Sequence, residues 1–290
     1  MAGMPGAVVP PDQGTAGRHA SVVYSDDRQW AAHLCAFVRG GLERNEQMQY
    51  FADATDPEQV LHALADDGID AAEAVRRGQL TVSTAARTYL AGAVFDPDSV
   101  FALWDEGVDA AAANGYRGLR VVGEMSWGTR NIAGADRLLE YELRIHHEVF
   151  ERLPLTAWCF YDRRLVSDEG VNVLAGAHLT HRGGSAAGTA LQVAPLHDSP
   201  GFLLSGSAGY DTRRVIDATA AAVSHAPTPR LELDLSDLHH VDAASLATLA
   251  EAAGRRPGGV PLQLREAPEA LRRLLDLFPE LGSAVEVVGR

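Results

Sequence analysis

The segment Gly118-Leu-Arg-Val-Val-Gly-Glu-Met-Ser-Trp127 joins a short apolar run to a cluster of polar and aromatic residues. The β-branched run follows a glycine and a long helical pattern, which is typical of an inner strand of a parallel sheet. Ligands collect at the carboxyl ends of such strands. We therefore expect Glu124, Ser126 and Trp127 at the mouth of a crevice. A strand followed by a loop, with an incidental glutamate and a core tryptophan, explains the segment equally well.

Length and composition limit the class of protein. The 290 residues exceed what one ordinary core organises, so two domains of unequal size are expected. Hydrophobic residues make up 46% and charged residues 22%, as in soluble globular proteins. The net charge of −14 disfavours nucleic acid or an anionic membrane as the main partner.

No targeting or membrane signal is recognised in the sequence. No apolar run reaches the roughly 20 residues that cross a bilayer. Residues 1–17 lack a secretion signal and are expected to form a flexible tail. Cys35 and Cys159 lie in apolar surroundings typical of reduced thiols, which indicates a cytoplasmic protein.

Strands and helices alternate through residues 18–181. We expect strands at 19–24, 47–51, 79–83, 118–122 and 155–161, and helices at 27–44, 57–67, 70–76, 100–113, 135–152 and 168–174. This alternation is typical of a parallel sheet with helices on both faces.

A second, smaller pattern follows. Residues 182–189 are glycine-rich without apolar periodicity, and we expect them to be a linker. Within residues 190–290 the expected strands are 191–196, 202–205, 231–235, 261–264 and 285–288, and the expected helices are 211–224, 244–253 and 268–277. About 100 residues suffice for an independent α/β domain.

Several phrases of the first domain occur together in a known family. They are Phe37-Val-Arg-Gly-Gly-Leu42, Phe95-Asp-Pro97, Gly115-Tyr-Arg-Gly-Leu-Arg-Val-Val-Gly-Glu-Met-Ser-Trp127, Leu139-Glu-Tyr-Glu142 and Cys159-Phe-Tyr-Asp162. On these phrases, residues 18–181 resemble the MEDS domain, a sensory module of methanogens and methylotrophs. The resemblance implies a RecA-like fold and the sensing of small organic, hydrocarbon-derived molecules. Ser21 departs from the family, which usually has Cys there, and Glu124 stands where Asp is common.

The expected phosphate-binding loop of a RecA-like ATPase is missing. Such a loop needs glycines for close backbone approach and a lysine against the phosphates. The turn Tyr24-Ser-Asp-Asp27 has neither, and its carboxylates would repel a triphosphate. We therefore predict no enzymatic activity and no cofactor. The alternatives are an ATPase with an unorthodox phosphate site, a hydrolase using Glu124 as general base, and a scaffold whose crevice is filled by its own aromatic side chains.

The predicted ligand-binding residues lie at strand ends and on the long helix. They are His19, Tyr24, Glu124, Ser126, Trp127, Glu140, Tyr161 and Asp162. His19 is expected to pair with a glutamate or, more simply, with a backbone carbonyl. Glu140 and Glu142 are roughly 200° apart on a helix, so one of them is expected to face solvent.

Histidine and cysteine spacings do not favour a metal site. The candidates are His33-x-Cys35, His146-His147 and His178-x-x-His181. A structural zinc site normally shows paired close spacings of these ligands. No metal is therefore expected.

The second domain resembles a STAS domain, the fold of anti-sigma factor antagonists, through Leu231-Glu-Leu-Asp-Leu-Ser-Asp-Leu-His-His-Val-Asp-Ala-Ala-Ser-Leu246. In regulated members a partner kinase phosphorylates a Ser or Thr after the loop Asp, and the added charge switches binding. Here Ala243 follows Asp242, so docking without phosphorylation at that position is expected. Ser236 and Ser245 are weaker substitutes. The predicted partner-binding residues are Ser236, Asp242, Ala243, Ala244 and Ser245.

Together the two resemblances imply a cytoplasmic signalling regulator. A ligand-sensing first domain would control a STAS domain that binds an anti-sigma factor or related partner. Both families commonly self-associate, so a homo-oligomer is allowed.

Overall fold

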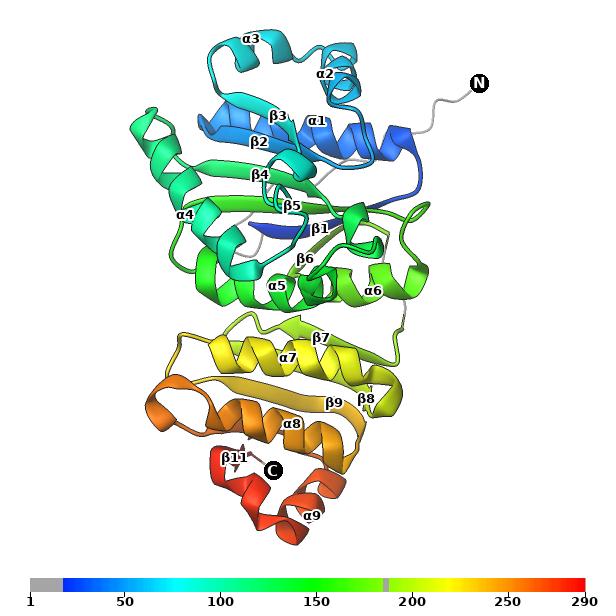
Figure 1. Cartoon of the computed structure of the whole chain (residues 1–290), viewed down its shortest axis with the longest axis vertical. Coiled ribbons are helices and arrows are strands. Elements are labelled where there is room, and N and C mark those ends of the chain that lie inside the picture. The colour runs from blue at the N-terminus through cyan, green and yellow to red at the C-terminus, as the bar shows by residue number, and fades with distance from the viewer. Residues whose placement is uncertain (1–17, 185–187, 290) are drawn as a thin grey trace.

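The computed structural model describes residues 18–184 and 188–289. The predicted tail, residues 1–17, lies outside the described residues. Two sheets with their helices are arranged one after the other along the long axis of the molecule (Figure 1). Within the described ranges, no helix combines the length and the apolar character that crossing a membrane requires.

The first sheet is parallel throughout, and the segment that ends at Trp127 supplies its inner strand. The strands are β1 (His19–Tyr24), β2 (Gln47–Ala52), β3 (Leu80–Thr84), β4 (Leu119–Glu124), β5 (Leu155–Asp162) and β6 (Thr180–Gly183). Their order is β3-β2-β4-β5-β1-β6, and every pairing is parallel. β4 lies between β2 and β5, with both faces covered, which explains its near-continuous apolar run.

Helices cover both faces of this sheet, which confirms the predicted α/β class. α1 (Asp27–Arg44), α2 (Pro57–Asp66) and α3 (Ala71–Arg76) pack on one face, and α4 (Pro97–Ala113), α5 (Leu138–Ile145) and α6 (Asp168–Gly176) on the other. Side chains at the N-caps accept a backbone N–H and so set where five of these helices begin: Asp26, Asp56, Asp70, Asp96 and Ser167.

The second sheet is mixed. Its strands are β7 (Leu191–Pro195), β8 (Gly201–Ala208), β9 (Glu232–Val241), β10 (Leu262–Arg265) and β11 (Val285–Val288), in the order β11-β10-β9-β8-β7. Only the β7–β8 pair is antiparallel. Alternate strand residues enter a core with α7 (Arg213–His225), α8 (Ala243–Gly254) and α9 (Glu269–Leu277).

The two sheets do not have separate cores at their junction. Leu139 and Leu143 of α5 belong to the same buried apolar cluster as Leu191 of β7 and Val215 of α7. Leu143 is completely buried. The first domain therefore contributes part of the core of the second.

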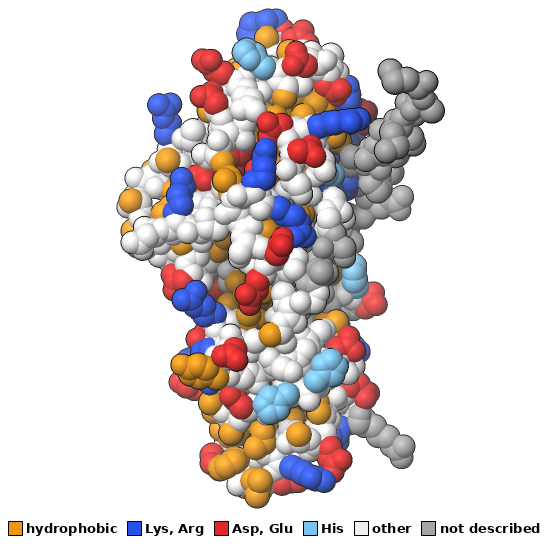
Figure 2. Space-filling view, turned by 90° about the vertical axis from the view of Figure 1, so that its right-hand side faces the viewer, with side chains coloured by type: hydrophobic (Ala, Val, Ile, Leu, Met, Phe, Trp, Pro, Cys, Tyr) orange, Lys and Arg blue, Asp and Glu red, His pale blue; other side chains and the backbone are white. Residues whose placement is uncertain are grey.

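The surface is of mixed charge and carries an apolar end. In Figure 2, acidic and basic side chains are interspersed, and hydrophobic side chains gather at the end formed by the C-terminal segment. Leu277 and Phe278 at the end of α9 are 71% and 41% exposed. The visible face thus carries no broad field of one sign.

Two elements differ from the sequence-based prediction. β6 was not predicted, because Thr-His-Arg-Gly has no apolar alternation; it exists because it pairs with β1 at the sheet edge. Arg182 and Gly183, which the predicted linker included, belong to β6. The helix predicted over residues 135–152 is divided into a 3₁₀ turn, α5 and a π turn over His146–Phe150.

Candidate functional site

The predicted crevice at the carboxyl end of β4 is filled by side chains of the protein. Trp127 is fully buried, and its Nε1 donates to the hydroxyl of Tyr89 at 3.2 Å. Its ring lies 4.6 Å from that of Phe95. The cavity that remains among these aromatic residues has a volume of about 20 Å³, which is roughly the space of one water molecule.

Glu124 holds the neighbouring loop together. Its Oε1 accepts a hydrogen bond from Tyr50 at 2.6 Å, and its Oε2 accepts from the backbone N–H groups of Asp53, Ala54 and Thr55 at 2.8, 2.8 and 3.0 Å. The residue as a whole is 1% exposed. Both carboxylate oxygens of Glu124 accept hydrogen bonds, so in this geometry the side chain has a structural role.

The other predicted strand-end residues also have partners among the described side chains. Ser126 donates to Asp53 at 2.6 Å, and Asp162 pairs with Arg164 at 2.7 Å. Tyr24 is buried on the face of the sheet away from Trp127, edge to face with Phe160, and burial raises the pKa of its hydroxyl well above the usual range. Their roles as ligand contacts remain predictions.

His19 belongs to a buried polar cluster at the other end of its strand. It starts β1 and faces α5, where its Nε2 lies 3.1 Å from Glu142 Oε2. Cys159 Sγ lies 3.5 Å from the same oxygen and 3.8 Å from His19 Nε2. His178 Nε2 lies 3.4 Å from that oxygen. Tyr161 completes the group by donating to Glu142 Oε1 at 2.7 Å. We call these five residues the His–Glu–Cys cluster.

Burial disfavours charge throughout this cluster. It lowers the pKa of His19 to about 3, and burial with the nearby His19 lowers the pKa of His178 to about 3 as well. Burial raises the pKa of Glu142, although His178, Tyr161 and Cys159 oppose that shift. Burial and the Glu142 carboxylate raise the pKa of the Cys159 thiol. The imidazoles are therefore neutral at ordinary pH and present lone pairs.

The cluster uses residues that sequence reasoning did not combine. We expected one of Glu140 and Glu142 to face solvent, and this expectation is wrong: they are 6% and 0% exposed. α5 lies between the first sheet and α7, so its two sides are both covered. The phrases Leu139-Glu-Tyr-Glu142 and Cys159-Phe-Tyr-Asp162 contained the signal, since each brings one acidic or thiol ligand to a buried element.

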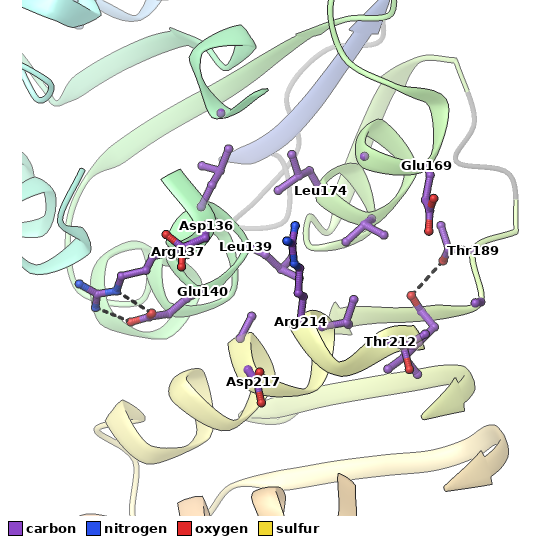
Figure 3. A pocket seen from close by; sticks show the side chains of 18 of the residues that line it. Asp136, Arg137, Leu139, Glu140, Glu169, Leu174, Thr189, Thr212, Arg214 and Asp217 are labelled. Carbon is purple, nitrogen blue, oxygen red and sulfur yellow. Dashed lines mark hydrogen bonds and ion pairs between the residues drawn. The ribbon is translucent and has the colours of Figure 1, made fainter. Parts of the chain in front are cut away.

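A larger cavity, of about 650 Å³, lies at the junction of the two domains (Figure 3). The first domain lines it with residues of α5 and α6, and the second domain with residues of β7 and α7. Arg214 points from α7 into this space, while Leu139, Leu174 and Leu191 contribute apolar surface. We call it the junction pocket.

Glu140 is the predicted ligand-binding residue that lines the junction pocket. Its carboxylate accepts from Arg137 at 2.8 and 2.9 Å and from Arg144 at 2.8 Å. Burial alone would raise the pKa of Glu140, but these hydrogen bonds outweigh it and lower the pKa. A charged glutamate with two arginine partners thus forms one wall of the pocket.

The predicted partner-binding residues are gathered at the start of α8. Asp242 caps the helix by accepting from the Ser245 N–H at 2.6 Å, and Ala243 and Ala244 are exposed beside it. Ser236 is exposed, but Ser245 is completely buried. The loop that carries Tyr210 adjoins this helix start, because Asp242 N donates to Ala208 O. Tyr210 is 87% exposed and was not predicted.

Comparison with known families agrees with this architecture. Residues 18–181 match the MEDS family, described as the methanogen/methylotroph, DcmR sensory domain. Residues 196–279 match the family described as "Mlab, STAS domain". Among curated proteins no match was found. The first match spans more than half of the chain, so this protein belongs to the MEDS family and carries a STAS domain after its MEDS domain.

Proposed function

We propose that this chain is a non-enzymatic regulator in which a small molecule bound in the junction pocket changes how the STAS domain meets a protein partner. The supporting observation is that both domains line this pocket. A ligand in this pocket contacts both α5 and α7. Its affinity therefore differs between one relative position of the two domains and another. Such differential affinity is what allows a ligand to shift a conformational equilibrium.

The pocket suits a small organic molecule with an apolar body and one hydrogen-bond acceptor. Leu139, Leu174 and Val215 offer apolar contact, and the Arg214 guanidinium offers donors. The expected class agrees with the small, hydrocarbon-derived molecules that the family resemblance implies.

The ligand part of the proposal is tested by native mass spectrometry of the purified full chain. We expect the spectrum to show a small molecule bound to the chain. It should be absent in Ala190→Trp, because this substitution at an exposed position places a large ring in the pocket. Ala86→Trp, on an exposed turn of the first domain, is the matched control and should keep the ligand. Equal retention by both variants would place the ligand elsewhere.

For the partner, we propose an anti-sigma factor or another STAS-binding protein that docks on Tyr210 and the start of α8. An exposed tyrosine beside an accessible helix end provides a large rigid contact. Tyr210→Ala should weaken binding by about tenfold or more in titration calorimetry. Leu165→Ala, at a 48% exposed position of the first domain, should leave the affinity unchanged.

A scaffold that only binds proteins is the second candidate, and one observation favours it. The strand-end crevice is filled by Trp127, Phe95 and Tyr89, as that interpretation predicted. Partner affinity measured with and without the retained ligand separates the two. A sensor requires a difference, whereas a scaffold gives the same value.

Nucleotide binding is tested separately. Asp26 already caps the N-terminus of α1 through the Gln29 N–H at 2.8 Å, at the position where a RecA-like protein holds phosphate. Calorimetry with ATP and magnesium should therefore show no heat of binding. Micromolar affinity for ATP would restore the ATPase alternative.

A further inference from the structure

We propose that His19, Glu142, Cys159 and His178 form a buried site for a divalent transition-metal ion, with Zn²⁺ the best match to the donor set. This site differs from every histidine and cysteine pairing considered in the sequence. It is also independent of the junction pocket and of the proposed function.

The separations from Glu142 Oε2 to the other three ligand atoms are near those of a tetrahedral site. Zn–N bonds of about 2.0 Å and Zn–S bonds of about 2.3 Å require ligand atoms separated by roughly 3.3–3.7 Å. Three contacts of Glu142 Oε2 are 3.1 Å to His19 Nε2, 3.5 Å to Cys159 Sγ and 3.4 Å to His178 Nε2. All four ligand atoms lie within 4.8 Å of one another. Small adjustments of side chains therefore suffice for coordination.

The tautomer of His178 favours a cation at this site. Its Nδ1 lies 3.0 Å from the carbonyl oxygen of Leu174, which can only accept, so Nδ1 carries the proton. Nε2 then presents a lone pair to Glu142 Oε2, and it makes no hydrogen bond within the described ranges. Two buried lone pairs facing each other at 3.4 Å repel unless a proton or a metal ion lies between them.

Outer contacts orient two of the ligands, His178 and Glu142, as they do in known zinc sites. The Leu174 carbonyl fixes His178, and Tyr161 donates to Glu142 Oε1, which leaves Oε2 free to face the cluster. The His19 ring stacks on Phe150 of the π turn with centroids 4.8 Å apart. These contacts come from α6, β5 and the π turn, so the geometry is held from several sides.

A divalent ion would balance the charges of the ligands at this site. Zn²⁺ with a Cys159 thiolate, a Glu142 carboxylate and two neutral imidazoles has no net charge, which suits a site whose four residues are all buried. Binding releases the thiol proton and any proton held by Glu142 to solvent. Thiolate and imidazole donors together favour Zn²⁺ over Mg²⁺ or Ca²⁺.

Metal content of the full chain tests the site. Protein unfolded with chelator and refolded with Zn²⁺ should hold about one zinc per chain, measured by mass spectrometry of the elements. Cys159→Ser and His178→Gln should lower that content at least tenfold. Cys35→Ser and His146→Gln are the matched controls and should keep it. His146 also belongs to a second group of possible ligands, with His147 and Glu151.

Refolding with Co²⁺ gives a second readout that does not require the Cys159 or His178 variants to fold. A thiolate-to-cobalt charge-transfer band should appear in the wild type and in Cys35→Ser. Three outcomes would each overturn the proposal. They are a folded wild type that holds no metal, a cobalt complex without that band, and zinc that is lost in His146→Gln but kept in Cys159→Ser. The first result would indicate a proton-sharing cluster instead.

Discussion

Glu124 is an acidic residue at a strand end, which led us to predict a ligand contact. Its hydrogen bonds instead give it a structural role. Four donors converge on one carboxylate, and three of them are consecutive backbone N–H groups of the loop after β2. Removing the acceptor leaves these donors without their partner, which costs more than the hydrogen bonds themselves contribute.

Glu124→Ala should therefore destabilise the protein by about 3 kcal/mol. Glu124→Gln should lower the stability less than Glu124→Ala does. Its side-chain carbonyl can still accept hydrogen bonds, although its NH₂ group cannot accept from the other donors. Urea unfolding followed by circular dichroism measures both. A Glu124→Ala chain with unchanged stability but lost ligand retention would favour the original ligand-binding prediction.

Ser245 shows how burial limits regulation by phosphorylation. Its side chain is 0% exposed at the start of α8, so a kinase cannot reach the hydroxyl in the folded domain. Ser245→Asp places a charge in the core and should cost more than about 2 kcal/mol. Ser236→Asp, on an exposed part of β9, is the control and should be nearly neutral. Thermal unfolding compares them, and a stable Ser245→Asp would reopen Ser245 as a switch.

At the scale of elements, N-caps decide where the helices begin. Asp242 accepts the Ser245 N–H and stands at the end of β9, so it ends the strand and starts α8. The hydrogen bonds with Ser245 are also the main reason that the pKa of Asp242 is lowered.

Asp242→Ala should lower the free energy of unfolding by about 1 kcal/mol at neutral pH. Because the folded-state pKa is lowered, the capping contribution is present above the unfolded value of about 3.9 and is lost as pH falls through the folded-state pKa. The difference in unfolding free energy between wild type and variant should therefore shrink as the pH falls below about 4. Unfolding curves at several pH values check this, and a pH-independent difference would contradict it.

α5 carries three functions on one short helix. Glu142 faces the His–Glu–Cys cluster, Glu140 lines the junction pocket, and Leu143 enters the core of the second domain. The π turn that follows it widens the helix by one residue and brings His147 edge to face with Phe202 of β8, at 5.4 Å. The three contacts are therefore brought together on one short element.

At the scale of the whole molecule, the shared apolar core couples the two domains. Leu143 of α5 is completely buried within the cluster that includes Val215 and Leu191. Buried apolar contact between domains makes them unfold together, because separating them exposes that surface to water.

Leu143→Asp should uncouple the domains by placing a charge in this interface. Calorimetric unfolding is expected to change from one transition to two, and small-angle scattering should show a larger radius of gyration. Leu165→Asp, at an exposed position, is the control and should leave a single transition. One transition in both variants would show that the domains are joined by other contacts.

The order of strands and helices, the aspartate caps and the two family resemblances were all determined by local sequence, since each depends on a few neighbouring residues. β6 was not predicted, because a strand at the edge of a sheet can be polar and still pair with its neighbour. The His–Glu–Cys cluster and the junction pocket were decided only by the tertiary structure. His19 and Glu142 are 123 residues apart, and they meet because the sheet order places β1 beside β5 under α5. Helical periodicity could not show that both sides of α5 are buried, because the second covering surface belongs to another domain.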